Sequence, residues 1–354
     1  MGSASHPPRR RASDRPKRGL RVVAIGGGTG LATLLKGLKG YTALSGDDFS
    51  TRPIATLSAV VTVTDDGGSS GRLRKELNML PPGDIRNCIV ALSEDEALLS
   101  KLFRHRFAKG SGLEGHSFGN LFLAALTSMT RDFGEAVRLS SEVLATRGHI
   151  YPVTTANVEL EALLEDGTRV RGETRITASK GRIQELFLVP PDAEPLPQTL
   201  EALAHADLIS MGPGSLFTSL IPNLLVKGIA QAIAQSPALK VYICNLMTQA
   251  NESLGRSAAD HIRALNAHAG RPIFDCALIN SQPVSAELKA KYALEGAAPV
   301  VADCEAIREL GVEPVLGNYL EEGEAARHAT DRIARDLLKL ATKAQTRALP
   351  SPAG

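Results

Sequence analysis

Short apolar runs alternate with amphipathic stretches along most of the chain, and each such pair predicts a strand followed by a helix. The first strand is predicted at residues 20–25, and leucines at helical spacing follow from Leu31 to Leu38. Further apolar strands are predicted at 54–64, 208–211, 241–244 and 273–279, and a closing amphipathic helix at 325–343. This alternation indicates an α/β fold, a Rossmann-like and mostly parallel sheet with helices on both faces.

Two regions depart from this alternation. Residues 72–146 are predicted to be mainly helical, with helices at 85–92 (Asp84 as its N-cap), 94–107, 118–130 and 132–144. From about 150 to 190 the apolar period changes to two, Asp166-Gly167 marks a hairpin, and the alternation continues from Val170 to Ile176. We therefore expect a β-meander inserted into the α/β framework.

Composition and charge set the domain boundaries. The chain has 354 residues, 43% of them hydrophobic and 22% charged, which suits one α/β domain over 19–343. Residues 1–18 hold six basic residues against Asp14, so a chain of net charge +2 leaves −3 for the rest. We interpret 1–18 as a disordered basic leader and 344–354 as a tail; a weak polyanion-binding arm is the other interpretation of the leader. The acidic remainder argues against a specific nucleic-acid partner.

Other classes are disfavoured by what the chain lacks. Its four cysteines are widely spaced without a CxxC pair, which argues against a zinc knuckle or a disulfide framework and fits a reducing cytoplasm. No run approaches the roughly 18 apolar residues that a membrane-spanning helix needs. We expect a cytoplasmic protein without membrane insertion, for which a homo-oligomer is the default assembly; the sequence does not identify its protein partners.

Two glycine-rich segments follow predicted strands and suit an anion. Open α/β sheets bind ligands where strands end, and glycines let backbone N–H groups approach a phosphate. The first segment has neither a Walker lysine nor the third glycine of a dinucleotide fingerprint, which leaves a phosphate or diphosphate. A tight strand-to-helix turn is the alternative for both. The candidate ligands are Gly27, Gly28, Thr29 and Gly30 in the first segment, and Gly212, Gly214, Ser215 (also as an N-cap), Thr218 and Asn223 in the second.

An acidic loop follows the second predicted strand. Asp65 and Asp66 could hold Mg²⁺ with a substrate phosphate, accept hydrogen bonds from sugar hydroxyls, or cap a helix. Gly68 and Ser69 continue this loop as further candidate ligands. The sequence does not separate these three roles.

Further polar residues stand at helix starts and strand ends. Arg86 is predicted to pair either with phosphate or with Asp84, and Asn87 follows it. His116 and Asn120 lie where a helix begins, and Asn245, Thr248 and Gln249 carry groups that suit a base or a sugar edge. No triad spacing is present, so we assign no catalytic residue.

Six segments together resemble one family, in order along the chain. They are AIGGGTGL, VTVTDDGGSSGRLR, LPPGDIRNC, GHSFGN, MGPGSLFTSLIPNLL and YICNLMTQ. They are similar to the signatures of the bacterial gluconeogenesis factors, within the wider 2-phospho-L-lactate transferase superfamily. The resemblance covers roughly residues 20–345 and leaves the basic leader outside.

The resemblance implies a Rossmann-like core and binding of UDP-sugars, notably UDP-N-acetylglucosamine, without established catalysis. It implies a cytoplasmic regulatory role in cell shape and envelope (peptidoglycan) synthesis on gluconeogenic carbon. Carried onto this chain, the diphosphate would contact Gly27–Gly30 and Gly214–Ser215. Asp65, Asp66, Asn120 and Asn245 would then face the nucleotide or the sugar.

The transferase relatives imply an alternative, a Mg²⁺-dependent phospholactate-type transfer from a nucleotide-diphosphate-linked substrate. An acceptor with a flavin-like ring would favour an aromatic pocket, yet this chain has no Trp and only 4% aromatic residues. A module that binds nucleic acid or a membrane surface through the basic leader is a third hypothesis. An NAD-dependent dehydrogenase is disfavoured because the glycine spacing fails.

Overall fold

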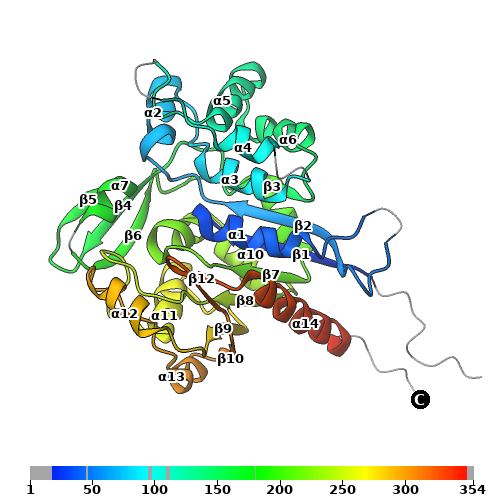
Figure 1. Ribbon diagram of the computed structural model, residues 1–354, viewed down its shortest axis with the longest axis vertical. Helices are drawn as coiled ribbons and strands as arrows, with labels where there is room; N and C mark the ends of the chain where they lie inside the picture. The colour runs from blue at the N-terminus through cyan, green and yellow to red at the C-terminus, as the bar shows by residue number, and fades with distance from the viewer. Residues whose placement is uncertain (1–17, 45–46, 95–97, 109–111, 180, 349–354) are drawn as a thin grey trace, which may run out of the picture.

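The computed structural model describes residues 18–44, 47–94, 98–108, 112–179 and 181–348. Its main sheet has seven strands, all parallel, in the order β10-β9-β8-β7-β1-β2-β3 (Figure 1). Their bounds are β1 (Leu20–Gly26), β2 (Ile54–Val61), β3 (His149–Pro152), β7 (Leu208–Met211), β8 (Leu239–Ile243), β9 (Cys276–Asn280) and β10 (Glu313–Gly317). The predicted α/β class is confirmed.

Helices flank this sheet, and five of them gather along its β2–β3 side at the top of Figure 1. These five are α2 (Gly68–Leu77), α3 (Gly83–Leu92), α4 (Leu98–Arg104), α5 (Phe118–Thr130) and α6 (Phe133–Val143). The others in the main body are α1 (Gly28–Lys39), α8 (Pro197–Ala204), the π-helix η1 (Leu216–Leu220), α9 (Ile221–Leu225), α10 (Ile229–Gln235), α11 (Ala258–Ala269), α12 (Ala286–Ala293), α13 (Cys304–Glu309) and α14 (Thr330–Ala348).

Two small antiparallel sheets complete the fold. One contains β4 (Glu159–Leu164), β5 (Arg169–Arg171) and β6 (Ile183–Val189), with α7 (Glu173–Ala178) between its last two strands. The other is a hairpin of β11 (Leu320–Glu322) and β12 (Ala326–His328).

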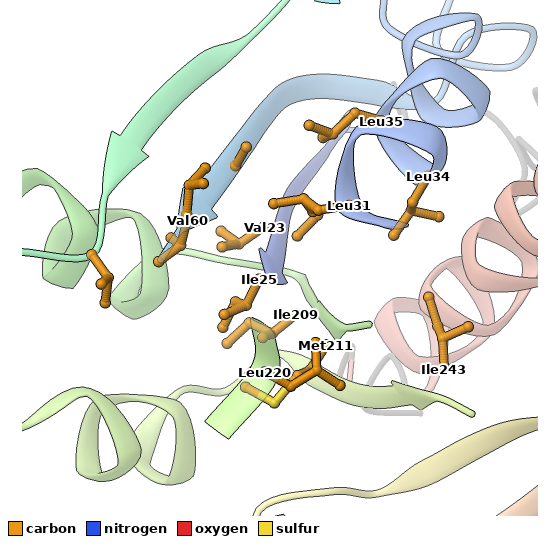
Figure 2. Close-up of a cluster of buried hydrophobic side chains, with 14 of the residues drawn as sticks. Val23, Ile25, Leu31, Leu34, Leu35, Val60, Ile209, Met211, Leu220 and Ile243 are labelled. Carbon is orange, nitrogen blue, oxygen red and sulfur yellow. The ribbon is translucent and has the colours of Figure 1, made fainter. Parts of the chain in front are cut away.

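Apolar side chains from the central strands and from α1 belong to one buried core. Figure 2 shows Val23 and Ile25 of β1, Val60 of β2 and Ile209 and Met211 of β7, together with Leu31, Leu34 and Leu35 of α1. All are buried, because a central strand of a parallel sheet is covered on both faces. This core holds the ends of β1 and β7 firmly in place.

The strand order reverses between β1 and β7. The chain builds outward from β1 through β2 to β3, and later from β7 through β8 and β9 to β10. Parallel sheets bind ligands at such a switch point, outside the carboxyl ends of the strands. The two glycine-rich segments follow β1 and β7, so both lie at this point.

Several sequence predictions need correction. The first strand of the expected meander, β3, belongs to the main sheet, because it pairs in parallel with β2. The alternation predicted from Val170 to Ile176 stops at Arg171, and α7 takes its place. Helix α14 runs on to Ala348 inside the predicted tail, and residues 349–354 lie outside the described residues.

Other boundaries lie at the limits of what is described. The helix predicted at 94–107 is observed at Leu98–Arg104, next to the undescribed residues 95–97. Of the predicted leader, residues 1–17 lie outside the described residues and Arg18 pairs with Asp207. Within the described part of the chain, no single helix is long and apolar enough to cross a membrane; one bent pair, Leu216–Leu225 with Ile229–Gln235, reaches that length and composition together.

Candidate functional site

The β1–α1 loop and the β7–η1 loop lie against each other at the switch point. A Cβ atom added to Gly30 would stand 2.8 Å from the carbonyl carbon of Pro213, and one added to Gly214 would stand 3.8 Å from the Gly27 carbonyl oxygen. Gly30 therefore cannot carry a side chain without moving backbone. The structure thus brings the two predicted anion loops together.

The N-terminus of α1 already faces a carboxylate. Gly28, whose φ of +61° favours glycine, donates its N–H to Asp84 at the start of α3. Burial raises the pKa of Asp84 to about 6 despite that hydrogen bond. Asp84 was predicted to be the N-cap of α3, and this is wrong: α3 begins at Gly83 with Pro82 as its N-cap, and Asp84 lies in its first turn.

Thr29 and Gly30 follow Gly28 in the first turn of α1. Their N–H groups belong to the set that has no partner within a helix, and Thr29 is exposed while Gly30 is half-buried. These two donors are the part of the loop that remains open to a ligand.

The β7–η1 loop also holds an internal carboxylate, that of Glu252. Glu252 accepts the N–H of Phe217 at 3.2 Å and the hydroxyl of Thr218 at 2.8 Å. Its side chain is buried, and this burial raises its pKa. Thr218, a predicted ligand, is thus turned toward Glu252.

Amide side chains from the segment after β8 hold the rest of this loop. Asn245 donates to the Gly214 carbonyl at 2.9 Å, and Gln249 donates to Ser215 Oγ at 3.0 Å. Ser215 stands at the N-cap of η1 as predicted, but its side chain makes no capping hydrogen bond. Gly212, at φ +91°, has the Ile243 carbonyl oxygen 2.7 Å from where its Cβ would be.

Two predicted residues in this part have mainly backbone partners. Asn223 is fully buried, and its amide donates to the carbonyls of Gly26, Ser219 and Leu220. Thr248 Oγ1 accepts the N–H of Ala298 at 2.9 Å. In this conformation both side chains stabilise loops.

The acidic loop meets this site through the start of α3. A Cβ added to Gly83 would lie 2.9 Å from Asp65 Oδ2, while Asp65 Oδ1 accepts the N–H of Gly67 at 2.9 Å. Asp66 accepts the N–H of Thr174 at 2.8 Å and so holds the start of α7. Asp65 keeps one oxygen for a ligand, and Asp66 ties the loop to the inserted sheet.

A polar network lies behind the acidic loop. Asn120 donates to Ser69 Oγ at 3.0 Å, and Ser69 Oγ is 2.9 Å from His116 Nδ1. Arg86 donates to Asn120 Oδ1 at 3.0 Å and to Asn87 Oδ1 at 2.8 Å. Among the described residues no carboxylate forms an ion pair with Arg86, so neither Asp84 nor any other acid occupies its guanidinium. Gly68, at φ +47°, is exposed beside this network with open space around it.

One residue that the sequence did not suggest is Glu173, on α7. Burial raises its pKa to about 8, with further contributions from Asp65, Asp66, Asp84 and Glu252. Glu173 therefore lies half-buried on the acidic side of the site, where the charges of these four carboxylates oppose its ionisation. No local signal marks it, since it lies in a stretch predicted to be strand. Glu252 could have been found, because it follows Gln249 by three residues in a segment after a buried strand.

The carboxylates do not form a ready-made metal cage. Over the described ranges, no three His, Cys, Asp or Glu side chains are arranged to hold one ion. Mg²⁺ is commonly bound by one or two carboxylates together with the phosphates of a substrate. The free oxygen of Asp65 fits that kind of site, and a dedicated protein site does not fit these residues.

A pocket of about 150 Å³ adjoins this site at the carboxyl ends of β8 and β9. Asn245, Asn280 and Gln282 line it, together with Pro283 and Pro299. The Oε1 atom of Gln282 is buried without a hydrogen-bond partner in the structure. An amide-lined pocket next to two glycine loops offers a ring with polar edges both space and partners.

Comparisons with known proteins agree with this geometry. The sequence profile of the 2-phospho-L-lactate transferase CofD family matches residues 22–320, which include both glycine loops, the acidic loop and the amide-lined pocket. The chain is 48% identical over 319 residues to the gluconeogenesis factor of Halalkalibacterium halodurans, covering 90% of this chain and 95% of that protein. The chain belongs to the gluconeogenesis factor family, within the CofD family. The gluconeogenesis factor of Bacillus subtilis is 47% identical, over 90% of this chain and 98% of that protein.

A solved structure supports the fold of this gluconeogenesis factor family member. A crystal structure of a UPF0052 family protein from Bacillus halodurans superposes with a TM-score of 0.85 at 47% identity. The superposition covers 91% of this chain and 99% of the solved chain. The resemblance inferred from six motifs is thereby confirmed at the level of family and fold.

Proposed function

We propose that this member of the gluconeogenesis factor family binds a UDP-sugar, UDP-N-acetylglucosamine or a close relative, and acts as a regulatory protein. The observation that carries this proposal is the contact of two glycine loops at the switch point, beside an amide-lined pocket. The two glycine loops and the pocket match what a nucleoside diphosphate sugar needs. The loops can donate hydrogen bonds to its two phosphates, and the separate pocket can hold a ring.

The available donors suggest how such a ligand is held. The N–H groups of Thr29 and Gly30 receive the diphosphate, with Gly214 and Ser215 on its other side. A pyrimidine ring has donors on its edge, and the unpaired amide oxygen of Gln282 can accept from one of them. The sugar then lies toward Asp65, whose second carboxylate oxygen can accept from a hydroxyl group, with Asn120 in the buried network behind it.

Charge at the site supports a cation as part of the ligand. Asp65, Asp84 and Glu252 lie near the loops assigned to the diphosphate, and each of these carboxylates repels phosphate when it is ionised. Mg²⁺ bound to the diphosphate and to Asp65 would offset that repulsion when present. Arg86, behind Asn120, adds positive charge from the protein itself.

The relatives' name supports a link to gluconeogenesis, and the rest of the wider role is a proposal from the resemblance. We place this protein in the control of cell shape and envelope synthesis on gluconeogenic carbon, in the cytoplasm and as a homo-oligomer. Its protein partners stay open.

Calorimetric titration with UDP-N-acetylglucosamine tests the proposal, with UDP, GDP and NAD as comparison ligands. We expect saturable binding of the UDP-sugar that is tighter than binding of GDP or NAD. Gln282→Leu removes the unpaired amide and should weaken UDP-sugar binding about tenfold, whereas Gln345→Leu, outside the pocket, serves as the matched control. Absence of saturable UDP-sugar binding contradicts the proposal.

A second candidate is a Mg²⁺-dependent phospholactate-type transferase, favoured by the family match and by the free oxygen of Asp65. It requires Mg²⁺ to increase nucleotide affinity through Asp65 and turnover to occur with a deazaflavin acceptor. If Asp65→Asn leaves the effect of Mg²⁺ on affinity unchanged, this candidate loses its support.

A further inference from the structure

A second concave surface lies at the amino end of the main sheet, between α14 and the segment that joins α1 to β2. Figure 1 shows α14 running away from the inserted sheet, toward this end of β1. The groove encloses about 490 Å³. Leu20, the first residue of β1, lines it, so it lies about 20 Å from the glycine loop at the other end of that strand.

The groove is strongly basic. Arg18, Arg335, Lys339 and Lys343 line it, and no acidic residue is found in its lining among the described residues. Two of these cations are partly compensated by neighbours outside the lining: Arg18 pairs with Asp207, and Lys339 lies 3.4 Å from Asp336.

The other two cations have no carboxylate partner within the described ranges. Arg335 donates to the Asp331 carbonyl at 3.2 Å, and Lys343 is exposed. Because neither positive charge is neutralised by the protein, the groove retains an excess of positive charge.

Between the cations the groove is apolar. Leu20 and Leu338 form buried parts of its lining, and the rings of Tyr41 and Phe49 are half-buried at its side. A ligand of this groove should therefore alternate negative and apolar groups.

The spacing of the cations suits an extended chain. Arg335, Lys339 and Lys343 follow one another at four-residue intervals on α14, which places them about 6 Å apart along the helix axis. Alternate side chains of an extended peptide are about 6.6 Å apart. We propose that this groove docks an acidic peptide segment of a partner protein, with carboxylates on α14 and apolar side chains on Tyr41, Phe49 and Leu338.

Other occupants fit less well. The leader at residues 1–17 is itself basic, so like charge opposes its insertion. Nucleic acid needs a broad basic surface, whereas residues 19–354 carry a net charge of −3. A membrane surface is flat and does not reach the base of a groove.

Fluorescence anisotropy with the full chain tests this proposal. The probe is a labelled peptide that alternates Glu with Leu and Phe, and its control replaces every Glu by Gln. We expect saturable binding of the Glu peptide only, weakening as salt is raised because screening shortens electrostatic range to about 8 Å at physiological salt. The triple variant Arg335→Glu/Lys339→Glu/Lys343→Glu should bind the peptide at least tenfold more weakly.

Matched variants keep the result interpretable. Arg332→Glu makes the same charge change on α14 outside the groove and should bind the peptide normally. Lys343→Gln, a milder exposed change, should weaken binding severalfold if the triple variant proves unstable in thermal melts. Equal peptide binding by wild type and Lys343→Gln overturns the proposal. So does tighter, groove-dependent binding of a single-stranded oligonucleotide or of anionic phosphatidylserine vesicles. UDP-sugar titration of the same variants should be unchanged, which separates this proposal from the proposed function.

Discussion

The two glycine loops at the switch point have the same kind of sequence but different internal partners. The β1–α1 loop gives the Gly28 N–H to Asp84, which is partly exposed and close to Gly27. The β7–η1 loop gives the Phe217 N–H and the Thr218 hydroxyl to Glu252, which is buried. Each loop therefore donates hydrogen bonds to a carboxylate from elsewhere in the chain, although the sequence predicted that these donors bind a ligand phosphate.

The difference lies in how easily each carboxylate can be exchanged. Asp84 is only half-buried, so we expect a ligand to replace its hydrogen bond more easily than those of Glu252. Glu252 has no such access, and removing it leaves buried donors unpaired. We infer that the β1–α1 loop receives the anion, while the β7–η1 loop is a fixed support beside it.

The largest expected effect is a difference in the free energy of unfolding between the Glu252 and Asp84 variants. Glu252→Ala leaves the Phe217 N–H and the Thr218 hydroxyl unpaired in a buried place, so the free energy of unfolding should fall by about 3 kcal/mol. Asp84→Ala exposes one N–H to solvent and should cost about 1 kcal/mol or less. Urea denaturation at neutral pH measures both. Equal losses would show that the two loops do not differ in this way.

A smaller effect concerns the contact between the loops. Gly30→Ala places a Cβ 2.8 Å from the Pro213 carbonyl carbon, where backbone must move, so UDP-N-acetylglucosamine affinity should fall about a hundredfold. Gly26→Ala is the matched control, because its Cβ would meet Leu31 Cβ at 3.4 Å and be accommodated. Titration calorimetry compares the two variants. Unchanged affinity in Gly30→Ala would mean that the ligand does not depend on how the loops meet.

The smallest effect is a pH dependence from Glu173 on α7, a half-buried carboxyl whose raised pKa includes contributions from both loop carboxylates, Asp84 and Glu252. Its folded pKa of about 8 lies above an unfolded value of about 4.3, so between these values the folded state binds more protons. Stability should therefore decrease as pH rises through this window and level off above about 8.

Glu173→Gln cannot ionise and should be more stable than wild type by about 2 kcal/mol near pH 9, after allowance for its partial exposure. At about pH 4 the two should be equal. Urea midpoints at both pH values provide the measurement, with Glu309→Gln, an exposed residue of α13, as the control. If Glu173→Gln differs in stability from wild type by the same amount at both pH values, ionisation of Glu173 is not the cause.

Periodicity predicted most of the framework. The strands β1, β2 and β7 and the helices α5 and α6 lie where apolar spacing indicated them, because each has one buried pattern that local sequence displays. The pairing of β3 with β2 was not predictable in this way, since a four-residue strand carries no sign of which sheet it joins. The hairpin β11–β12 was missed because β12 (Ala326–His328) lies inside the stretch 325–343 that was predicted to be helix, whereas α14 begins only at Thr330.

For the site, the sequence by itself determined which loops carry glycine, acid and amide groups, and that they follow parallel strands. Only the tertiary structure decided that Asp66 holds α7, that Asn223 holds loop carbonyls, and that burial raises the pKa of Glu173. The physical reason is that a glycine loop reflects the local backbone conformation, which nearby residues determine. The role of a carboxylate depends instead on which hydrogen-bond donor lies next to it in the folded chain. Asp84 and Glu252 find those donors on elements far away in the sequence, and packing alone brings them together.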